Sequence, residues 1–155
     1  MIQKMTVNDI RVCVELAEKY HKEHWFGKHT KYDADYIFAN FRQFIVNPMV
    51  NMLVAYDDNK NIVGFSVCFM QPLLWSKQLR ATINFSYLEP DHRKSGKFNA
   101  MVQSHIEWAK QNNCVDINIG DGAEHNGKFG ILARQMNFDN VGTDAYMVLN
   151  YDKKD

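Results

Sequence analysis

The stretch from Ala81 to Asn113 combines a strand pattern, a short basic loop and a helical pattern, in that order. Residues 81–88 alternate with the two-residue period of a β-strand. From residue 98 onward, apolar side chains recur at the spacing of an amphipathic helix. The loop between them, residues 93–97, reads RKSGK. Because backbone N–H groups converge at a helix start and the helix dipole favours negative charge, the stretch predicts an anion-binding loop. The alternative is an ordinary surface connection.

The same patterns predict which residues share each face of the strand and which form the apolar side of the helix. One face of the strand is expected to carry Ala81, Ile83, Phe85 and Tyr87, and the other Thr82, Asn84, Ser86 and Leu88. The apolar stripe of the helix is expected to consist of Phe98, Met101, Val102, His105, Ile106 and Ala109.

The whole chain has the length and composition of one ordinary domain. Its 155 residues can bury a substantial core, and 46% of them are hydrophobic. Lys and Arg number 18, as do Asp and Glu, so no net charge draws the chain to nucleic acid. No apolar run approaches the ~20 residues of a membrane-spanning helix, and no signal-peptide pattern is present. We expect a single cytoplasmic domain over residues 1–155 that binds neither membranes nor nucleic acid.

The cysteines and histidines do not predict a metal site. Cys13, Cys68 and Cys114 are far apart and lie in apolar patterns, which favours buried free thiols. The histidines between residues 21 and 29 lack a cysteine or a further closely spaced carboxylate to complete a ligand set. We therefore expect a polar, aromatic loop in this segment and no bound metal.

Periodicity along the chain predicts the element order β-α-α-β-β-β-α-β-α-β-β. Three strands in a row before a helix favour a mixed sheet over a doubly wound parallel one. The expected strands are residues 1–6, 52–56, 62–70, 81–88, 115–119, 138–141 and 145–151, and the expected helices run from about residue 10 to 24, 33 to 46, 98 to 113 and 125 to 136.

This order, with the basic glycine loop between the fourth strand and the third helix, resembles the GNAT superfamily of acetyl-coenzyme A-dependent acyltransferases. The family loop reads Arg/Gln-x-x-Gly-x-Gly/Ala after a hydrophobic-x-Pro lead. Here Leu88–Glu89–Pro90 is the lead, and Arg93 and Gly96 take the first and fourth positions. Phe98 stands at the sixth position in place of a small residue.

A second family signature has Asn, then Tyr seven residues later, then Gly-Phe at eleven and twelve. Asn126 and Phe138 match it, whereas Ala133 replaces the Tyr and Asn137 replaces the Gly. The resemblance covers about Ala81 to Phe138, and the size and divergent loop are similar to small GNAT-like proteins of tailed bacteriophages.

The resemblance implies a three-layer α+β fold. Its mixed, mostly antiparallel sheet of about six to seven strands would be flanked by about four helices and splayed between the fourth and fifth strands. It also implies acetyl-CoA as cosubstrate and direct transfer of the acetyl group to a primary amine in a ternary complex. The acceptor, whether protein or small molecule, stays open, as does a homodimer. The departures from both signatures leave an alternative: an inactive GNAT-fold module that binds acyl-CoA or a partner protein.

The resemblance further identifies the anion as the pyrophosphate of coenzyme A. Gly96 would let the backbone approach it, and Phe98 would keep its amide while its ring turns into the core. The pantetheine arm would pair with the edge of the fourth strand. Asn126 would bind this arm or, alternatively, cap its own helix. The expected cofactor-binding residues are Tyr87, Leu88, Arg93, Lys94, Ser95, Gly96, Lys97, Phe98 and Asn126.

Acyl transfer needs a base for the amine and a donor that polarises the thioester carbonyl. A strand N–H near Leu88 is the candidate oxyanion donor. Because Ala133 cannot act as an acid, Tyr87, Tyr146 or a water would have to do so. The candidate bases are Glu89, Asp121, Glu124 and His125. Each of them is alternatively a solvated charge in a loop, and ordered waters held by Asn84 and Ser86 are another route for the proton. Of all these residues, Glu89, His125 and Tyr87 are the expected catalytic ones.

The acceptor site is expected between the first two helices and the last hairpin. Three aromatic side chains either line it or anchor the loop between those helices on the core; they are Trp25, Phe26 and Tyr32.

Overall fold

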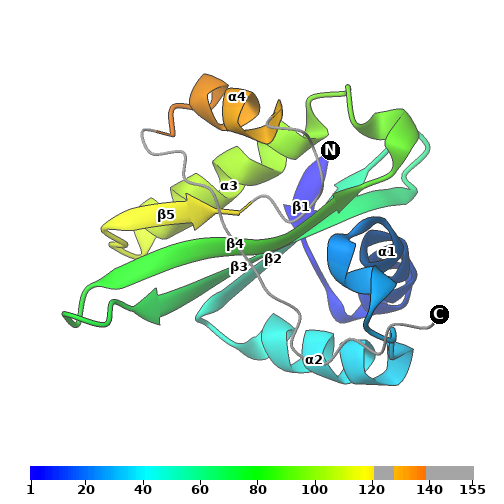
Figure 1. Cartoon of the computed structure of the whole chain (residues 1–155), viewed down its shortest axis with the longest axis horizontal. Helices are drawn as coiled ribbons and strands as arrows, with labels where there is room; N and C mark the ends of the chain where they lie inside the picture. The colour runs from blue at the N-terminus through cyan, green and yellow to red at the C-terminus, as the bar shows by residue number, and fades with distance from the viewer. Residues whose placement is uncertain (121–127, 139–155) are drawn as a thin grey trace.

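The computed structural model describes residues 1–120 and 128–138, and as far as the fourth helix its order of helices and strands is the expected one (Figure 1). The strands are β1 (Ile2–Lys4), β2 (Val50–Tyr56), β3 (Ile62–Pro72), β4 (Leu79–Leu88) and β5 (Asp116–Ile119). The helices are α1 (Ile10–Glu23), α2 (Ala34–Val46), α3 (Lys97–Gln111) and α4 (Lys128–Gln135). The strands expected over 138–141 and 145–151 fall almost entirely outside the described residues.

The described strands form one sheet in the order β1-β2-β3-β4-β5. All neighbours are antiparallel except β4 and β5, which are parallel. Helices α1 and α2 lie on one side of the sheet and α3 on the other (Figure 1). The mixed, mostly antiparallel sheet in a three-layer arrangement is therefore confirmed.

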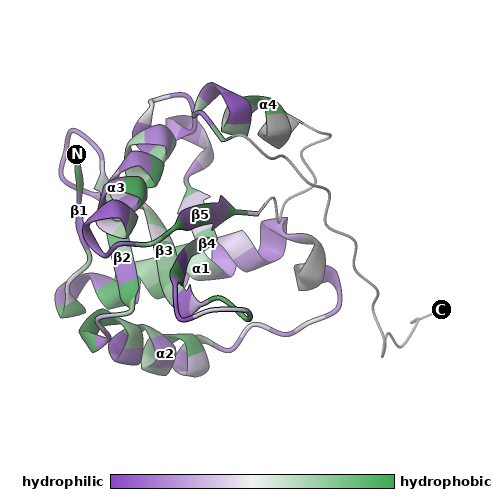
Figure 2. Ribbon diagram, turned by 90° about the vertical axis from the view of Figure 1, so that its left-hand side faces the viewer, coloured by the Kyte–Doolittle hydropathy of each residue, from purple (hydrophilic) through white to green (hydrophobic). Residues whose placement is uncertain are grey.

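Each face of the sheet has its own core. Phe65 and Val67 of β3 pack with Ile10 of α1 and Phe41 of α2. On the opposite face, a second cluster joins β3 and β4 to the apolar stripe of α3 through residues such as Val102. Figure 2 shows hydrophobic residues along β2 and β3 between these helix layers. The sheet is thus buried on both sides, which fits its near-continuous apolar strands.

A β-bulge changes the facing of β4 at Asn84. The register against β3 shifts there, which leaves Asn84 as an extra residue in β4. Before the bulge, Ala81 and Ile83 pack in the α3 core. After it, Tyr87 packs in the α1 and α2 core, and Phe85 makes an edge contact with a tyrosine of α1. The expectation that these four residues share one face is wrong, because strict alternation does not allow for a bulge.

The three cysteines are free thiols, as their apolar surroundings in the sequence predict. Cys13 and Cys68 are buried and free, whereas Cys114 is free and only partly buried. Burial raises the pKa of both Cys13 and Cys68 to about 12.

Within residues 1–120 and 128–138, no three His, Cys, Asp or Glu side chains lie close enough together to hold a metal ion. In the same residues, no helix is long and apolar enough to cross a bilayer.

Candidate functional site

The basic loop joins β4 to α3, as the sequence predicts. Residues Pro90–His92 form a short 3-10 turn, and Gly96 precedes α3 with φ 76° and ψ −4°. This left-handed conformation strains any residue with a Cβ, so glycine is favoured at this position. A Cβ placed on Gly96 would meet no atom within 4 Å. In the described part of the chain, the space beside Gly96 at the start of α3 is therefore open, and we call it the cradle.

Unpaired backbone donors line this cradle. Among the described residues, the N–H groups of Gly96, Lys97 and Phe98 have no hydrogen-bond partner, and no side chain caps α3. The helix has 15 residues, so its dipole adds partial positive charge at the same end. The Lys94 ammonium forms no ion pair within the described part of the chain. Donors, charge and space together fit a phosphate group.

Phe98 occupies the position where the GNAT loop has a small residue. Its backbone N–H stays in the cradle, while its ring is partly buried against the clusters that contain Val102 and Met101. The ring thus packs toward the core, as predicted, but it is only partly buried. The substitution therefore leaves the backbone N–H groups of the cradle in place.

Within residues 1–120 and 128–138, the second half of β4 has no strand partner on the side of β5, and we call this side its open edge. Parallel pairing ends at Ile83 with Ile119, while β4 continues to Leu88. The N–H of Glu89 donates to β3 at 2.9 Å, to the carbonyl of Val63. Antiparallel alternation then turns the main-chain groups of Tyr87 toward β3 and those of Ser86 and Leu88 toward the open edge. The chain that follows β5 after residue 120 lies outside the described residues, so the expected splay between β4 and β5 stays a prediction.

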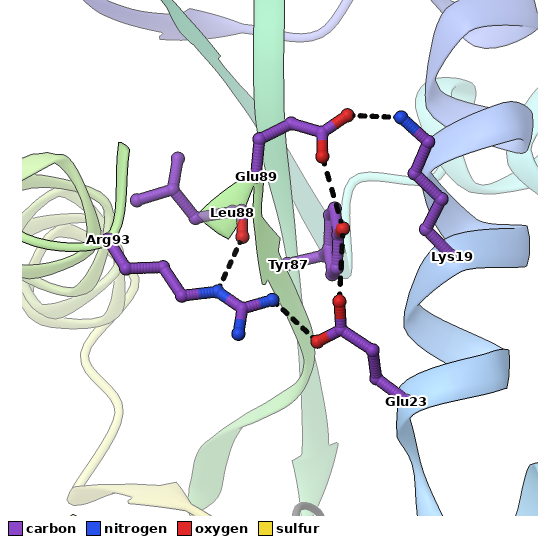
Figure 3. A network of polar contacts seen from close by, with 6 residues as sticks. All are labelled: Lys19, Glu23, Tyr87, Leu88, Glu89 and Arg93. Carbon is purple, nitrogen blue, oxygen red and sulfur yellow. Dashed lines mark hydrogen bonds and ion pairs between the residues drawn. The ribbon is translucent and has the colours of Figure 1, made fainter. Parts of the chain in front are cut away.

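Tyr87, Glu89 and Arg93 join a polar network with Lys19 and Glu23 of α1 (Figure 3). The Tyr87 hydroxyl lies 3.2 Å from Glu89 Oε2 and 3.4 Å from Glu23 Oε1. Lys19 forms an ion pair with Glu89, and Arg93 pairs with Glu23 at 2.5 Å. The network ties the last turn of α1 to the junction of β4 and the loop.

The phenol of Tyr87 is held in its neutral form. Burial, followed by the negative charges of Glu23 and Glu89, raises its pKa to about 12. The hydroxyl is therefore a donor that these two carboxylates share. It orients Glu89, the base candidate, at the end of the open strand edge.

Arg93 links the loop to β4 and to α1. Besides Glu23, its Nε donates to the carbonyl of Leu88 at 2.9 Å, and its guanidinium lies 5.7 Å from the centre of the Tyr87 ring. The Arg93 side chain thus contacts α1 and β4, and the cradle is formed by backbone groups. Sequence reasoning missed Glu23 and Lys19; their i,i+4 spacing on α1 marks one helix face but does not reveal that β4 lies opposite.

Ala133 and Asn137 have clear structural roles at the end of α4. Ala133 is 3% exposed and accepts a hydrogen bond from Phe138 N–H at 3.0 Å, while Asn137 N–H donates to Arg134 at 3.0 Å. Asn137 has φ 64°. This is a Schellman ending, in which a left-handed residue closes the helix. Asparagine tolerates that conformation, so Asn137 can replace the glycine of the family signature.

Several of the expected site residues fall outside the described part of the chain, and one of the others has a different role. His125, Asn126, Asp121, Glu124 and Tyr146 lie outside the described residues, as do the side chains of Trp25 and Phe26. Tyr32 donates to the carbonyl of Val14 at 2.6 Å and packs on the α1 and α2 core. This contact favours the anchoring role for Tyr32.

Comparisons with known proteins agree on one family and one fold. The family model described as the acetyltransferase (GNAT) family matches residues 13–127. A comparison with curated proteins gives no match. An aminoglycoside antibiotic 6'-N-acetyltransferase from Acinetobacter baumannii is similar over 97% of both chains, with 20% identity and a TM-score of 0.70.

Two further solved structures have the same fold. A ribosomal-protein-alanine N-acetyltransferase from Brucella melitensis is 16% identical, with a TM-score of 0.71 over 97% of this chain and 99% of its own. A glucosamine-6-phosphate N-acetyltransferase from Arabidopsis thaliana is 10% identical, with a TM-score of 0.75 over 97% and 98%. The names of these three proteins specify different acceptors, so this fold alone does not select one.

Proposed function

The chain belongs to the acetyltransferase (GNAT) family, and on that premise we propose that it is an N-acetyltransferase that uses acetyl-CoA and a primary amine. The observation that carries this proposal is the cradle at the start of α3. Gly96 adopts a left-handed conformation there, and the neighbouring N–H groups have no partner among the described residues. A pyrophosphate would satisfy these donors.

Different groups of the chain would bind different parts of acetyl-CoA. The N–H groups of Gly96, Lys97 and Phe98 would hold the pyrophosphate, and the charge of Lys94 would strengthen that interaction. The main-chain groups of Ser86 at the open edge of β4 would hold the extended arm, next to Leu88. When bound, acetyl-CoA supplies a thioester, whose thiolate is a fair leaving group.

For the chemical step, we propose Leu88 N–H as the group that polarises the thioester carbonyl. Glu89 is the proposed base among the described residues. Tyr87 and Lys19 fix its carboxylate beside the open edge, and its side chain remains 25% exposed, so an amine or a water can reach it. His125 as a second catalytic residue and Asn126 as a ligand of the arm remain parts of the proposal.

Thermal unfolding with and without acetyl-CoA tests the binding part of the proposal. A ligand at a hundred times its Kd stabilises the native state by about 2.7 kcal/mol, so the midpoint should rise clearly. Release of free coenzyme with a panel of amines tests the transfer. Gly96→Asn is the matched variant, because asparagine tolerates the left-handed conformation but places a side chain in the cradle. An unchanged midpoint at millimolar acetyl-CoA would refute the proposal.

A second candidate function is an acyl-CoA-binding module without turnover. The observation that favours it is the buried Ala133, at the position of the family's Tyr. This candidate predicts the same rise in the unfolding midpoint, but no coenzyme release above the uncatalysed rate with any amine of the panel. Coenzyme release that depends on Glu89 would exclude it.

A further inference from the structure

A chain of polar side chains crosses the α3 side of the sheet and ends at β4. Asn51 Nδ2 lies 3.0 Å from His105 Nδ1, and His105 Nε2 lies 2.9 Å from Ser66 Oγ. Ser66 Oγ lies 2.7 Å from Ser86 Oγ. His105 and Ser66 are fully buried, and in the described part of the chain no buried side-chain nitrogen or oxygen lacks a partner. We call these four residues the relay.

The hydrogen bonds of the relay all run in one direction, from Asn51 toward Ser86. The amide nitrogen of Asn51 can only donate, so Nδ1 of His105 accepts and the proton of the neutral ring lies on Nε2. That Nε2–H donates to Ser66. The described residues offer the Ser66 hydroxyl no acceptor other than Ser86, so its proton is directed to Ser86 Oγ. Burial lowers the pKa of His105 to about 4, so the ring is neutral at pH 7. The hydroxyl proton of Ser86 is left to donate outward.

Ser86 lies where the proposed cosubstrate arm would bind. It follows the bulge of β4, beyond the last pair with β5, and its side chain is on the α3 face. It is also only partly buried, unlike Ser66 and His105. A group that approaches the open edge next to Leu88 would therefore meet a hydroxyl already oriented as a donor.

We propose that Ser86 donates a hydrogen bond to a carbonyl oxygen of the acyl-CoA arm, and that His105 is a positioning residue that sets the direction of the relay through Ser66. This inference rests on the proposed function and adds a cosubstrate-binding side chain to it. It also explains why the imidazole of His105 and the hydroxyl of Ser66 are buried where aliphatic side chains would fill the core.

Isothermal titration with acetyl-CoA tests the role of Ser86. Ser86→Ala should weaken binding about fivefold to tenfold, the effect of one neutral hydrogen bond. Ser86→Thr keeps the hydroxyl and should restore most of the affinity. Ser104→Ala is the matched control, because among the described residues that half-buried α3 hydroxyl bonds only to the helix carbonyl of Ala100, at 2.9 Å. Wild-type affinity in Ser86→Ala, or an equal loss in Ser104→Ala, would overturn the inference.

The tautomer of His105 tests the direction of the relay without any ligand. Nitrogen NMR of the imidazole at pH 7 should show the proton on Nε2, and an Nδ1–H tautomer would reverse the relay and overturn the inference. The proposed function and the role of Ser86 can fail separately. If wild-type protein does not bind acetyl-CoA, the proposed function falls together with this inference, whereas unaltered binding by Ser86→Ala removes the role of Ser86 alone.

Discussion

The buried imidazole of His105 makes the stability of the protein depend on pH. Burial lowers its pKa from 6.5 to about 4 in the folded protein. Between these values the unfolded chain binds a proton that the folded chain does not, so protonation favours unfolding. This contribution therefore reduces stability as the pH falls from about 6.5 to about 4 and changes little outside that range.

The size of the effect follows from the two pKa values. With 6.5 in the unfolded chain and about 4 in the folded one, linkage predicts a loss of about 2 kcal/mol between pH 7 and pH 5. Two carboxyl groups with lowered pKa, Asp57 and Asp116, lose their contributions only nearer pH 4, since an unperturbed aspartate titrates at 3.8. They do not mask the histidine over this interval.

Urea unfolding followed by circular dichroism at pH 7, 6 and 5 measures this loss. His105→Gln removes the titrating group and keeps a polar side chain. Between pH 7 and pH 5 the variant should therefore lose about 2 kcal/mol less stability than the wild type loses. The variant should be less stable at pH 7, because it breaks the hydrogen bond to Asn51. Parallel pH dependences for the two proteins would refute the assignment of His105 as a buried, neutral ring.

Three further outcomes follow from the structure. Gly96→Ala should lower stability by about 1 kcal/mol because of left-handed strain, and Gly96→Asn by less; urea titration compares the two, and equal losses would contradict the strain. Asn137→Ala should cost about 1 kcal/mol and Asn137→Gly should cost nothing, as read from thermal midpoints, because only alanine resists the left-handed C-terminal position. Under native conditions an alkylating reagent should modify Cys114 before Cys13 or Cys68, with mass spectrometry to locate the label; early labelling of Cys68 would argue against its burial.

Local signals in the sequence are enough to predict much of this fold. The loop and its helix follow from one glycine, one basic cluster and an apolar stripe, all within a few residues of each other. The stripe also places His105 on the buried face of α3. Asn137 at the end of α4 could be matched to a family glycine by position, and the structure supplies the reason: both residues can adopt a left-handed conformation.

Features that depend on distant partners could not be predicted. The bulge at Asn84 becomes visible only when β4 is paired with β3. The contacts of Glu23 and Lys19 with β4, and the partners of His105, join segments far apart in the sequence. The roles of His125 and Asn126, a cytoplasmic location and a likeness to phage proteins stay predictions.

The central claim is that the cradle at Gly96 binds the pyrophosphate of acetyl-CoA. Its most direct test compares the affinities of wild type and Gly96→Asn for acetyl-CoA and for acetyl-pantetheine, which has the same arm and thioester but no pyrophosphate or nucleotide. We predict that the wild type strongly prefers acetyl-CoA and that Gly96→Asn loses most of this preference while it binds acetyl-pantetheine as the wild type does. An undiminished preference for acetyl-CoA in Gly96→Asn would contradict the claim.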